Sequence, residues 1–191
     1  ASDEPERVDR LVGRLRDWWP ASSPRRPPNV LLLVTDDQRA DAMSCAGHPI
    51  LSTPRLDQLA ARGARFTNAF VTTSICAASR ASLFTSLHER RHGYTFRTPP
   101  LAREHTALSY PGVLRGAGYR TGFVGKFGVR AEKGATAAMF DVFAPRGRRP
   151  GFAEQADGTR RHFTDLVGDD AIEFLRGDDG RPFCLSVSFH A

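Results

Sequence analysis

Short apolar runs alternate along the chain with segments whose apolar residues recur at helical spacing. The run VLLLV, residues 30–34, is continuous and has β-branched ends, which predicts a strand buried on both faces of a parallel sheet. Similar patterns predict strands over residues 29–37, 64–72, 119–125 and 181–189, and helices over residues 53–63, 77–87, 110–118 and 164–177. Strands that alternate with helices predict an α/β fold, with a mixed, mainly parallel sheet and helices on both of its faces.

The segment TPRLDQLAARG, residues 53–63, carries clear signals for the start and the end of a helix. Thr53 is a favoured N-cap residue, and Pro54 suits the first helical position. Gly63 is a common residue just after a helix. These signals predict the bounds of this helix, whereas the other helices are predicted mainly from their apolar spacing.

The first part of the chain differs from the rest. Residues 4–19 place apolar side chains at helical spacing with arginines between them, which predicts an amphipathic helix. We expect it to dock on its own domain, because docking stabilises most such helices, and a membrane surface is the alternative. Residues 20–28, PASSPRRPP, are typical of a linker. The predicted organisation is therefore a helix and linker over residues 1–28 and one domain over residues 29–191.

The composition is that of a folded domain. Hydrophobic residues make up 40% and charged residues 25% of the 191 residues, which is enough for a single domain with a core. No apolar run approaches the length of a membrane span, so we expect no transmembrane segment. The first residue is Ala1, and we expect that a leader was removed or that the sequence was trimmed.

The net charge of +6 rests on arginine, since only two of the 27 basic residues, Lys126 and Lys133, are lysines. Arginine suits bidentate binding of phosphate, sulfate or carboxylate oxygens, although codon bias in a GC-rich genome also explains the excess. A nucleic-acid-binding protein carries basic residues in a stripe with aromatic residues between them. Here the basic clusters lie in Pro- and Gly-rich loops, so we expect no nucleic-acid partner.

The three cysteines, Cys45, Cys76 and Cys184, form neither a disulfide framework nor a zinc-ligand spacing. Cys184 lies in a predicted buried strand, where cysteine is usually an inert small hydrophobic residue. Cys76 instead precedes a predicted helix, whose N-terminus favours an anion or a thiolate. A cysteine-phosphatase loop would need arginine at position 82, which is serine here. A monothiol redox motif remains an alternative, but it leaves the nearby Arg80 unexplained.

Two adjacent carboxylates, Asp36 and Asp37, follow the first predicted strand. In an α/β sheet, ligands bind beyond the carboxyl ends of the strands. Two carboxylates in such a place repel each other unless a cation lies between them, and oxygen ligands suit Ca²⁺ or Mg²⁺. In the alternative interpretation, one aspartate caps the next element and the other faces water.

Five segments occur in an order and spacing that resemble a known family. They are PNVLLLVTDDQRADAMSCAG, TPRLDQLAARGARFTNAF, CAASRASLFTS followed by RRHGY, GYRTGFVGK, and PFCLSVSFHA. Together they resemble the N-terminal part of a sulfatase of the alkaline-phosphatase-like superfamily, from about residue 29 to the last residue. The resemblance implies the alkaline-phosphatase-like form of the α/β fold, incomplete in this chain.

The resemblance also implies a site. Cys76 matches the cysteine that a maturation enzyme oxidises to formylglycine, whose hydrated aldehyde attacks sulfur and is regenerated as sulfate leaves. Asp36 and Asp37 match the first two ligands of a calcium ion, and the residue derived from Cys76 is expected as a further ligand. Arg80 matches the arginine that holds the formylglycine region. Lys126 matches a lysine that contacts a sulfate oxygen.

Three positions depart from the family pattern. Ala78 stands where the maturation motif usually has proline, and Ser86 stands where a glycine is usual. Gly128 stands where the family usually has a histidine, so we expect its proton-handling role to be absent or supplied elsewhere. We expect His92 to be structural, and we assign no catalytic role to His190, because the matching catalytic histidine lies beyond this segment.

The expected function is therefore hydrolysis of sulfate monoesters, on an aryl or a carbohydrate sulfate. One alternative is a phosphonate monoester or phosphodiester hydrolase of the same superfamily, and another is a non-catalytic protein that binds sulfated glycans. In the family, the other calcium ligands and a second lysine come from later sequence, so we expect this chain to be a fragment. Family members are often exported or lysosomal.

Overall fold

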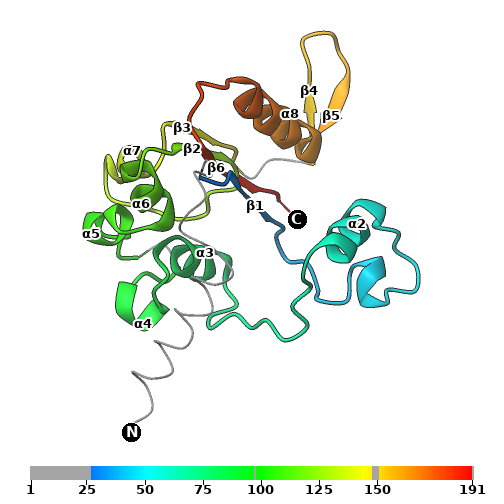
Figure 1. The fold of residues 1–191 in the computed structure, drawn as a ribbon, viewed down its shortest axis with the longest axis horizontal. Coiled ribbons are helices and arrows are strands. Elements are labelled where there is room, and N and C mark those ends of the chain that lie inside the picture. The colour runs from blue at the N-terminus through cyan, green and yellow to red at the C-terminus, as the bar shows by residue number, and fades with distance from the viewer. Residues whose placement is uncertain (1–26, 97, 148–150, 191) are drawn as a thin grey trace, which may run out of the picture.

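The computed structural model describes residues 27–96, 98–147 and 151–190. Its main sheet has four parallel strands in the order β1 (Val30–Val34), β6 (Phe183–Ser188), β2 (Arg120–Gly125) and β3 (Val142–Pro145). A separate antiparallel pair consists of β4 (Phe152–Glu154) and β5 (Arg160–His162). This pair projects beyond the main sheet, next to the last helix (Figure 1). The predicted mainly parallel sheet is therefore confirmed.

Helices connect most of these strands. They are α2 (Pro54–Arg62), α3 (Cys76–Thr85), α4 (Glu89–His92), α5 (Arg103–Ala107), α6 (Tyr110–Gly116), α7 (Ala135–Met139) and α8 (Phe163–Arg176), with a 3₁₀ helix η1 (Ser44–Ala46). The four helices predicted from the sequence correspond to α2, α3, α6 and α8. Ser109 caps α6, because its side chain accepts a hydrogen bond from the backbone N–H of Gly112.

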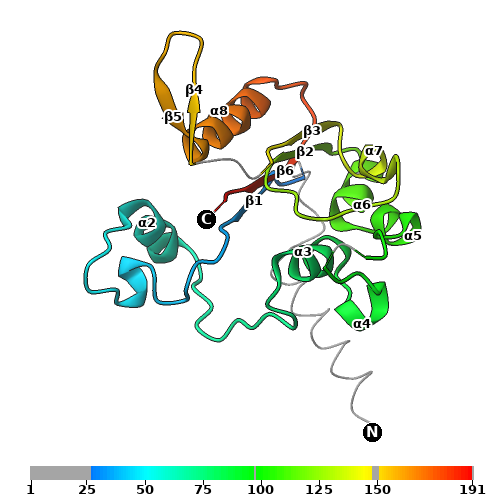
Figure 2. The same ribbon diagram turned by 180° about the vertical axis from the view of Figure 1, so that it is seen from behind.

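Two apolar cores lie on opposite faces of the main sheet, because successive side chains of a strand point to opposite sides. Phe123 of β2 packs on one face, in a core that includes Ala81 and Phe84 of α3 and Met139 of α7. The next residue, Val124, packs on the other face with Val167 and Phe174 of α8. Figures 1 and 2 show α8 on one side of the sheet and the other helices of the cores on the opposite side. Helices on both faces are thus confirmed.

The structure places α2 between the residues that the sequence predicts, from Pro54 to Arg62. The side chain of Thr53, however, makes no capping hydrogen bond. Its Oγ1 instead accepts a hydrogen bond of 2.9 Å from the backbone N–H of Ser44. Thr53 therefore ties η1 to the start of α2.

The prediction that the first strand is buried on both faces is wrong for β1. Leu31 and Leu33 are each 48% exposed. Within the residues that the structure describes, β1 pairs with β6 alone and forms an edge of the sheet. The continuous apolar run therefore identified a strand, but this edge position leaves part of its surface uncovered.

The predicted strand over residues 64–72 is also wrong, since this segment forms no strand. Phe66 is 83% exposed and Phe70 is 87% exposed. A strand needs a partner for its backbone groups, and the described part of the chain offers this segment none. The small strands β3, β4 and β5 were not predicted, because each has only three or four residues.

The amphipathic helix predicted over residues 4–19 and most of the predicted linker lie outside the described residues. Among the helices that the structure does describe, none combines the length and the apolar character that a membrane crossing requires.

Candidate active site

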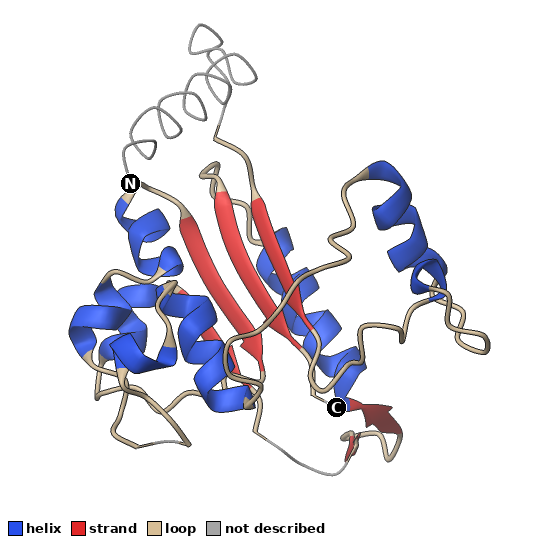
Figure 3. Ribbon diagram, turned by 90° about the horizontal axis from the view of Figure 1, so that it is seen from below, coloured by secondary structure: helices blue, strands red, loops and turns tan. Residues whose placement is uncertain are grey.

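The carboxyl ends of the parallel strands meet at one edge of the main sheet, hereafter the carboxyl edge (Figure 3). Asp36 follows β1, Lys126 follows β2, and Ser188 is the last residue of β6. The backbone N–H of Lys126 donates a hydrogen bond of 2.8 Å to the carbonyl of Ser188. Gly125 permits this approach, because it has a φ of 93° and a Cβ there would collide with the Ser188 carbonyl.

Arg80 reaches this edge from α3. Its Nη1 donates to the backbone carbonyl of Lys126 at 2.7 Å and also to the side-chain oxygen of Ser188. Its Nη2 lies 3.5 Å from Oδ1 of Asp36. The helix can approach the sheet closely because its buried residues include three alanines, Ala77, Ala78 and Ala81. Arg80 itself is only 5% exposed, so these contacts replace most of its hydration.

Lys126 completes a cluster of three charged groups, because its Nζ forms an ion pair with Oδ2 of Asp36. The Asp36 side chain is 8% exposed and the Lys126 side chain 19% exposed. Burial alone would raise the pKa of Asp36, but the hydrogen bond and charge of Lys126, with the charge of Arg80, lower it below its ordinary value. Two cations therefore face one carboxylate, and the excess positive charge favours an anionic ligand.

Asp37 differs from Asp36 in its exposure and in its contacts. It is exposed, and its φ of 50° lies in the left-handed region, which aspartate tolerates better than most residues. The backbone thus turns sharply directly after Asp36. Of the three predicted metal ligands, Asp36, Asp37 and Cys76, only Asp36 forms ion pairs in the charged cluster.

Cys76 is the first residue of α3 and is exposed. The first helical hydrogen bond runs from the N–H of Ser79 to the carbonyl of Ile75 at 2.8 Å, so the preceding N–H groups remain at the helix N-terminus. Residues four apart lie on the same face of a helix, so Cys76 and Arg80 face the same way. Since Arg80 points to the carboxyl edge, Cys76 lies on the face of α3 that is turned to it.

The other two cysteines offer no comparable group. Cys45 is only partly exposed, and Cys184 is buried within β6. Burial raises the pKa of the Cys184 thiol to about 11, so it stays protonated at neutral pH. Cys184 is thus the inert residue that the sequence predicts.

Gly128 lies against the arginine of the cluster. Its φ is 68°, and a Cβ built there would lie 2.9 Å from Cδ of Arg80. A histidine at this position, as in the resembling family, would therefore require Arg80 or the backbone to move. The glycine leaves room for the observed course of the Arg80 side chain.

The described residues supply part of a calcium site. Asp36 and Asp37 offer carboxylate oxygens, the donor class that calcium prefers, but calcium takes about six to eight oxygens. No group of three or more histidine, cysteine, aspartate or glutamate side chains suited to a metal occurs in the part of the chain that the structure describes. Two ligands fit the ion in kind, and they are too few to bind it alone.

His92 is held in one tautomer. Its Nδ1 accepts a hydrogen bond of 3.0 Å from the backbone N–H of Tyr94, so its Nε2 carries the proton and donates to Ser82 Oγ at 3.0 Å. Burial lowers the pKa of His92, which favours this neutral form. Such a histidine cannot take a proton from Ser82, so these contacts support the expected structural role.

His190 lies near Asp36 of the cluster. It lines a cavity of about 420 Å³ together with Asp36, and the other lining residues are Thr35, Gln38, Thr164 and Phe189. Its Nε2 donates to the backbone carbonyl of Arg146 at 3.0 Å. His190 was considered and given no catalytic role, and Ser188 was missed, although the rule that identified Asp36, that ligands bind after strand ends, applies equally to the end of β6.

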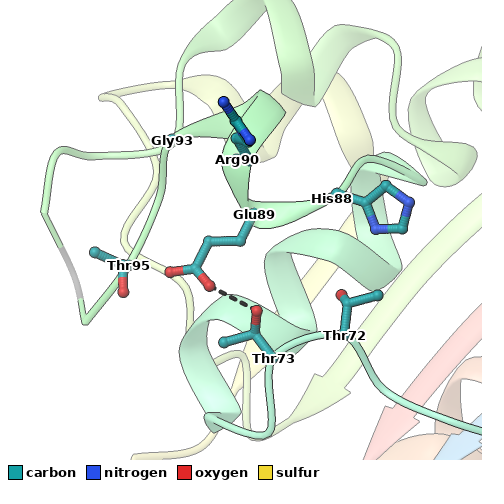
Figure 4. Close-up of a pocket in the computed structure, with 7 residues that line it drawn as sticks. All are labelled: Thr72, Thr73, His88, Glu89, Arg90, Gly93 and Thr95. Carbon is teal, nitrogen blue, oxygen red and sulfur yellow. Dashed lines mark hydrogen bonds between the residues drawn. The ribbon is translucent and has the colours of Figure 1, made fainter.

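A second cavity, of about 520 Å³, lies beside α4 (Figure 4). It is lined by Thr72, Thr73, His88, Glu89, Arg90, Gly93 and Thr95. Thr73 donates a hydrogen bond of 2.6 Å to the Glu89 carboxylate, which lowers the pKa of Glu89. None of the five predicted site residues lines it, so this cavity is separate from the charged cluster.

Comparison with known proteins identifies similar chains. A family model described as Sulfatase matches residues 28–191. The human N-sulphoglucosamine sulphohydrolase is 36% identical over 168 residues, which are 86% of this chain and 32% of that protein. A solved structure of a protein in complex with its substrate D-glucosamine-2-N,6-O-disulfate has a TM-score of 0.72 and 28% identity, over 86% of this chain and 34% of that one.

A further solved structure, the phosphonate monoester hydrolase of Agrobacterium radiobacter, has a TM-score of 0.62 and 25% identity. The similarity covers 85% of this chain and 40% of that one. The chain spans less than a third of the length of several curated relatives that it matches, from 17% to 32%.

Proposed function

Because this chain belongs to the sulfatase family, we propose that the protein hydrolyses sulfate monoesters, with a formylglycine derived from Cys76 as its nucleophile. The observation that carries this proposal is the cluster at the carboxyl edge. Arg80 and Lys126 meet Asp36 there, and Cys76 lies one helical turn from Arg80 on the same face of α3. A nucleophile beside an excess of positive charge suits attack on an anionic ester.

Each residue of the cluster has a distinct role in this proposal. Lys126 is a catalytic residue, whose ammonium group contacts a sulfate oxygen and stabilises negative charge there. Arg80 is a positioning residue, since its hydrogen bonds to the Lys126 carbonyl and to Ser188 hold two strand ends together beneath the N-terminus of α3. The oxidised side chain at position 76 supplies the attacking hydroxyl.

Calcium is part of the proposal. Asp36 and Asp37 would hold the ion together with ligands from other residues of the whole protein. When bound, calcium would polarise the sulfate group and favour deprotonation of the nucleophile. The low pKa of Asp36 supports this role, because a metal ligand must be ionised at neutral pH.

We propose a sulfated carbohydrate as the substrate class. The similar solved structure holds D-glucosamine-2-N,6-O-disulfate as its substrate, and the similar human protein is named for sulphoglucosamine. An aryl sulfate is a simpler ester of the same kind and serves as a test substrate.

The proposal includes a maturation enzyme as a partner, which oxidises Cys76 although Ala78 replaces the usual proline. Ala78 lies in the first turn of α3 and is fully buried, whereas Cys76 is exposed. The cysteine that must react is thus the accessible one. The neighbouring change from proline to alanine affects a side chain that only packs against the core.

Phosphonate monoester hydrolysis is the second candidate, which the similarity to the Agrobacterium enzyme favours. The intact protein, made together with a maturation enzyme, separates the two. We expect kcat/KM to be higher for a glucosamine 6-sulfate than for a phenyl phosphonate monoester. The reverse order would make phosphonate the preferred substrate and would contradict the sulfatase proposal.

Two variants test the nucleophile. Cys76→Ala removes it and is expected to lower kcat/KM at least about 10³-fold, as loss of a covalent nucleophile does. Cys45→Ala is the matched control and should keep full activity, because Cys45 lies outside the cluster. Mass spectrometry of the peptide with residues 66–80 should show an aldehyde at position 76. A free thiol there, with full activity, would refute the mechanism.

A further inference from the structure

We infer that the β4–β5 hairpin is a second anion-binding subsite of the active site, which holds a neighbouring sulfate or carboxylate group of the carbohydrate on Arg160 and Phe152. The inference rests on the proposed function for its location and its substrate class. The inference goes beyond that proposal, because it assigns to the hairpin the selection of an acidic oligosaccharide over a simple sulfate ester.

The hairpin adjoins the carboxyl edge. β5 ends at His162, and α8 begins with the next residue. Thr164, in the first turn of α8, lines the same cavity as Asp36 and His190. Figures 1 and 3 show the two strands projecting from this end of α8, near the described C-terminal end of the chain. A sugar chain bound at Asp36 can therefore extend toward the hairpin.

The hairpin presents an exposed ring and an exposed cation together. Phe152 is 51% exposed, and the guanidinium carbon of Arg160 lies 5.2 Å from the centre of its ring. The ring of His162 packs edge-on against the same phenylalanine, with centres 5.1 Å apart. Stacking on an aromatic face holds a guanidinium in one orientation, and its fork of N–H donors matches the oxygens of sulfate and carboxylate.

Two neighbouring arginines already have acidic partners within the chain. Arg146 forms an ion pair with Asp170, and Arg161 forms one with Asp169, both on α8. The Arg161 pair fixes β5 of the hairpin to the helix, and the Arg146 pair fixes the segment after β3 to it. Among the described residues, no acidic group lies within ion-pair distance of Arg160, although Glu154 is opposite it in the strand register. Among the described arginines at and beside the hairpin, Arg160 thus has no ion-pair partner and can accept an external anion.

The test measures binding and turnover separately, in the intact protein. The binding probe is a sulfated glycosaminoglycan hexasaccharide, titrated calorimetrically into the Cys76→Ala form so that it is not hydrolysed. The turnover probe is an aryl monosulfate, which carries no second anionic group for the hairpin to bind. Three variants are compared with the parent in each assay: Arg160→Gln, Glu154→Gln and Arg176→Gln.

Arg160→Gln should weaken binding of the hexasaccharide about fivefold, the upper effect of one exposed charge pair, and should leave aryl sulfate turnover unchanged. Glu154→Gln should strengthen binding, because it removes a negative charge beside the subsite. Arg176→Gln is the matched control, with an exposed arginine at the far end of α8, about 20 Å along the helix, and should alter binding less than twofold.

Equal weakening by Arg160→Gln and Arg176→Gln would overturn the inference, since only net charge would then matter. So would an absence of hexasaccharide binding in the parent. Absence of aryl sulfate turnover in the matured parent would instead refute the proposed function. The two failures therefore have different signatures.

Discussion

Two buried arginines lie at opposite ends of the same sheet and have opposite surroundings. Arg80, at the carboxyl edge, donates hydrogen bonds to a carbonyl and a hydroxyl and faces a carboxylate. Arg120, at the start of β2, stacks on Phe174 at 4.1 Å, and its Nε lies 3.9 Å from Asp179 without a hydrogen-bond partner among the described residues. The first arginine organises polar groups, and the second mainly covers an apolar ring.

The two ends of the sheet therefore have different roles: the carboxyl edge carries the candidate site, and the opposite end contributes to stability. At the carboxyl edge, Lys126 and Arg80 leave positive charge in excess, which costs folding energy unless an anion or a metal-bound anion compensates it. At the other end, Arg120 closes the core around α8. Changes at the carboxyl edge should therefore affect turnover, and changes at Arg120 should affect unfolding.

Removal of calcium is expected to have the largest effect at the carboxyl edge. Treatment of the intact, matured protein with EGTA should lower kcat/KM about 10³-fold, because a metal ion contributes several kcal/mol of charge stabilisation. Added calcium should restore the activity. Full activity after exhaustive chelation, with calcium absent by elemental analysis, would remove the metal from the proposal.

Lys126→Ala should lower kcat/KM about 10²-fold, as the loss of one group that stabilises developing charge does. Lys133→Ala is the matched control, because Lys133 is exposed and the only other lysine of the chain. Its activity should equal that of the parent. Equal activity of both variants would mean that Lys126 does not contact the reacting group.

Arg120→Ala should lower the free energy of unfolding by about 2 kcal/mol, from the loss of a desolvated cation–π contact and of packing by the side-chain stem. Denaturant unfolding of the intact protein measures this change. Arg120→Met keeps an apolar stem over Phe174 and should lose less. Aryl sulfate turnover should be unchanged in both variants, and a loss of turnover would break the proposed division between the two ends.

His92 gives the smallest effect, which is a change in how stability depends on pH. Burial lowers its pKa in the folded state, so the unfolded chain binds the proton more strongly. Stability is therefore full above the unfolded pKa, about 6.5, and falls as the pH drops through that value toward the folded pKa. His92→Gln should flatten this part of the stability curve, whereas His88→Gln, at an exposed position, should leave it as in the parent. Identical curves would contradict the role of His92.

The sequence predicted those strands and helices whose own residues carry a clear apolar pattern or clear signals at their ends. β2 and β6 lie in the centre of the sheet and are buried along most or all of their length, and α2 has its proline and glycine at the expected ends. The segment of residues 64–72 has the same apolar character but no strand partner, which no local pattern can reveal. Pairing is a property of the whole chain, so strand predictions fail where the partner is lacking.

The candidate site was predicted where one residue follows a strand or starts a helix. Asp36, Lys126 and Cys76 met this condition, whereas Arg80 was assigned from the family resemblance. The structure brings Asp36, Lys126 and Arg80 into contact. Ser188 was missed because serine in a buried strand carries no chemical signal by itself. Only the contact with Arg80 from α3, 108 residues earlier, gives it a role.

The close packing of Gly128 against Arg80 limits which amino-acid substitutions position 128 can accept during evolution. Because Gly128 has a positive φ and no room for a Cβ, a single change to histidine would displace Arg80 before any new proton donor could act. Positions 80 and 128 are therefore epistatic, and a saturation library at position 128 alone should return glycine among the active clones. A histidine at this position therefore requires a different course of the Arg80 side chain or of the backbone between β2 and residue 128.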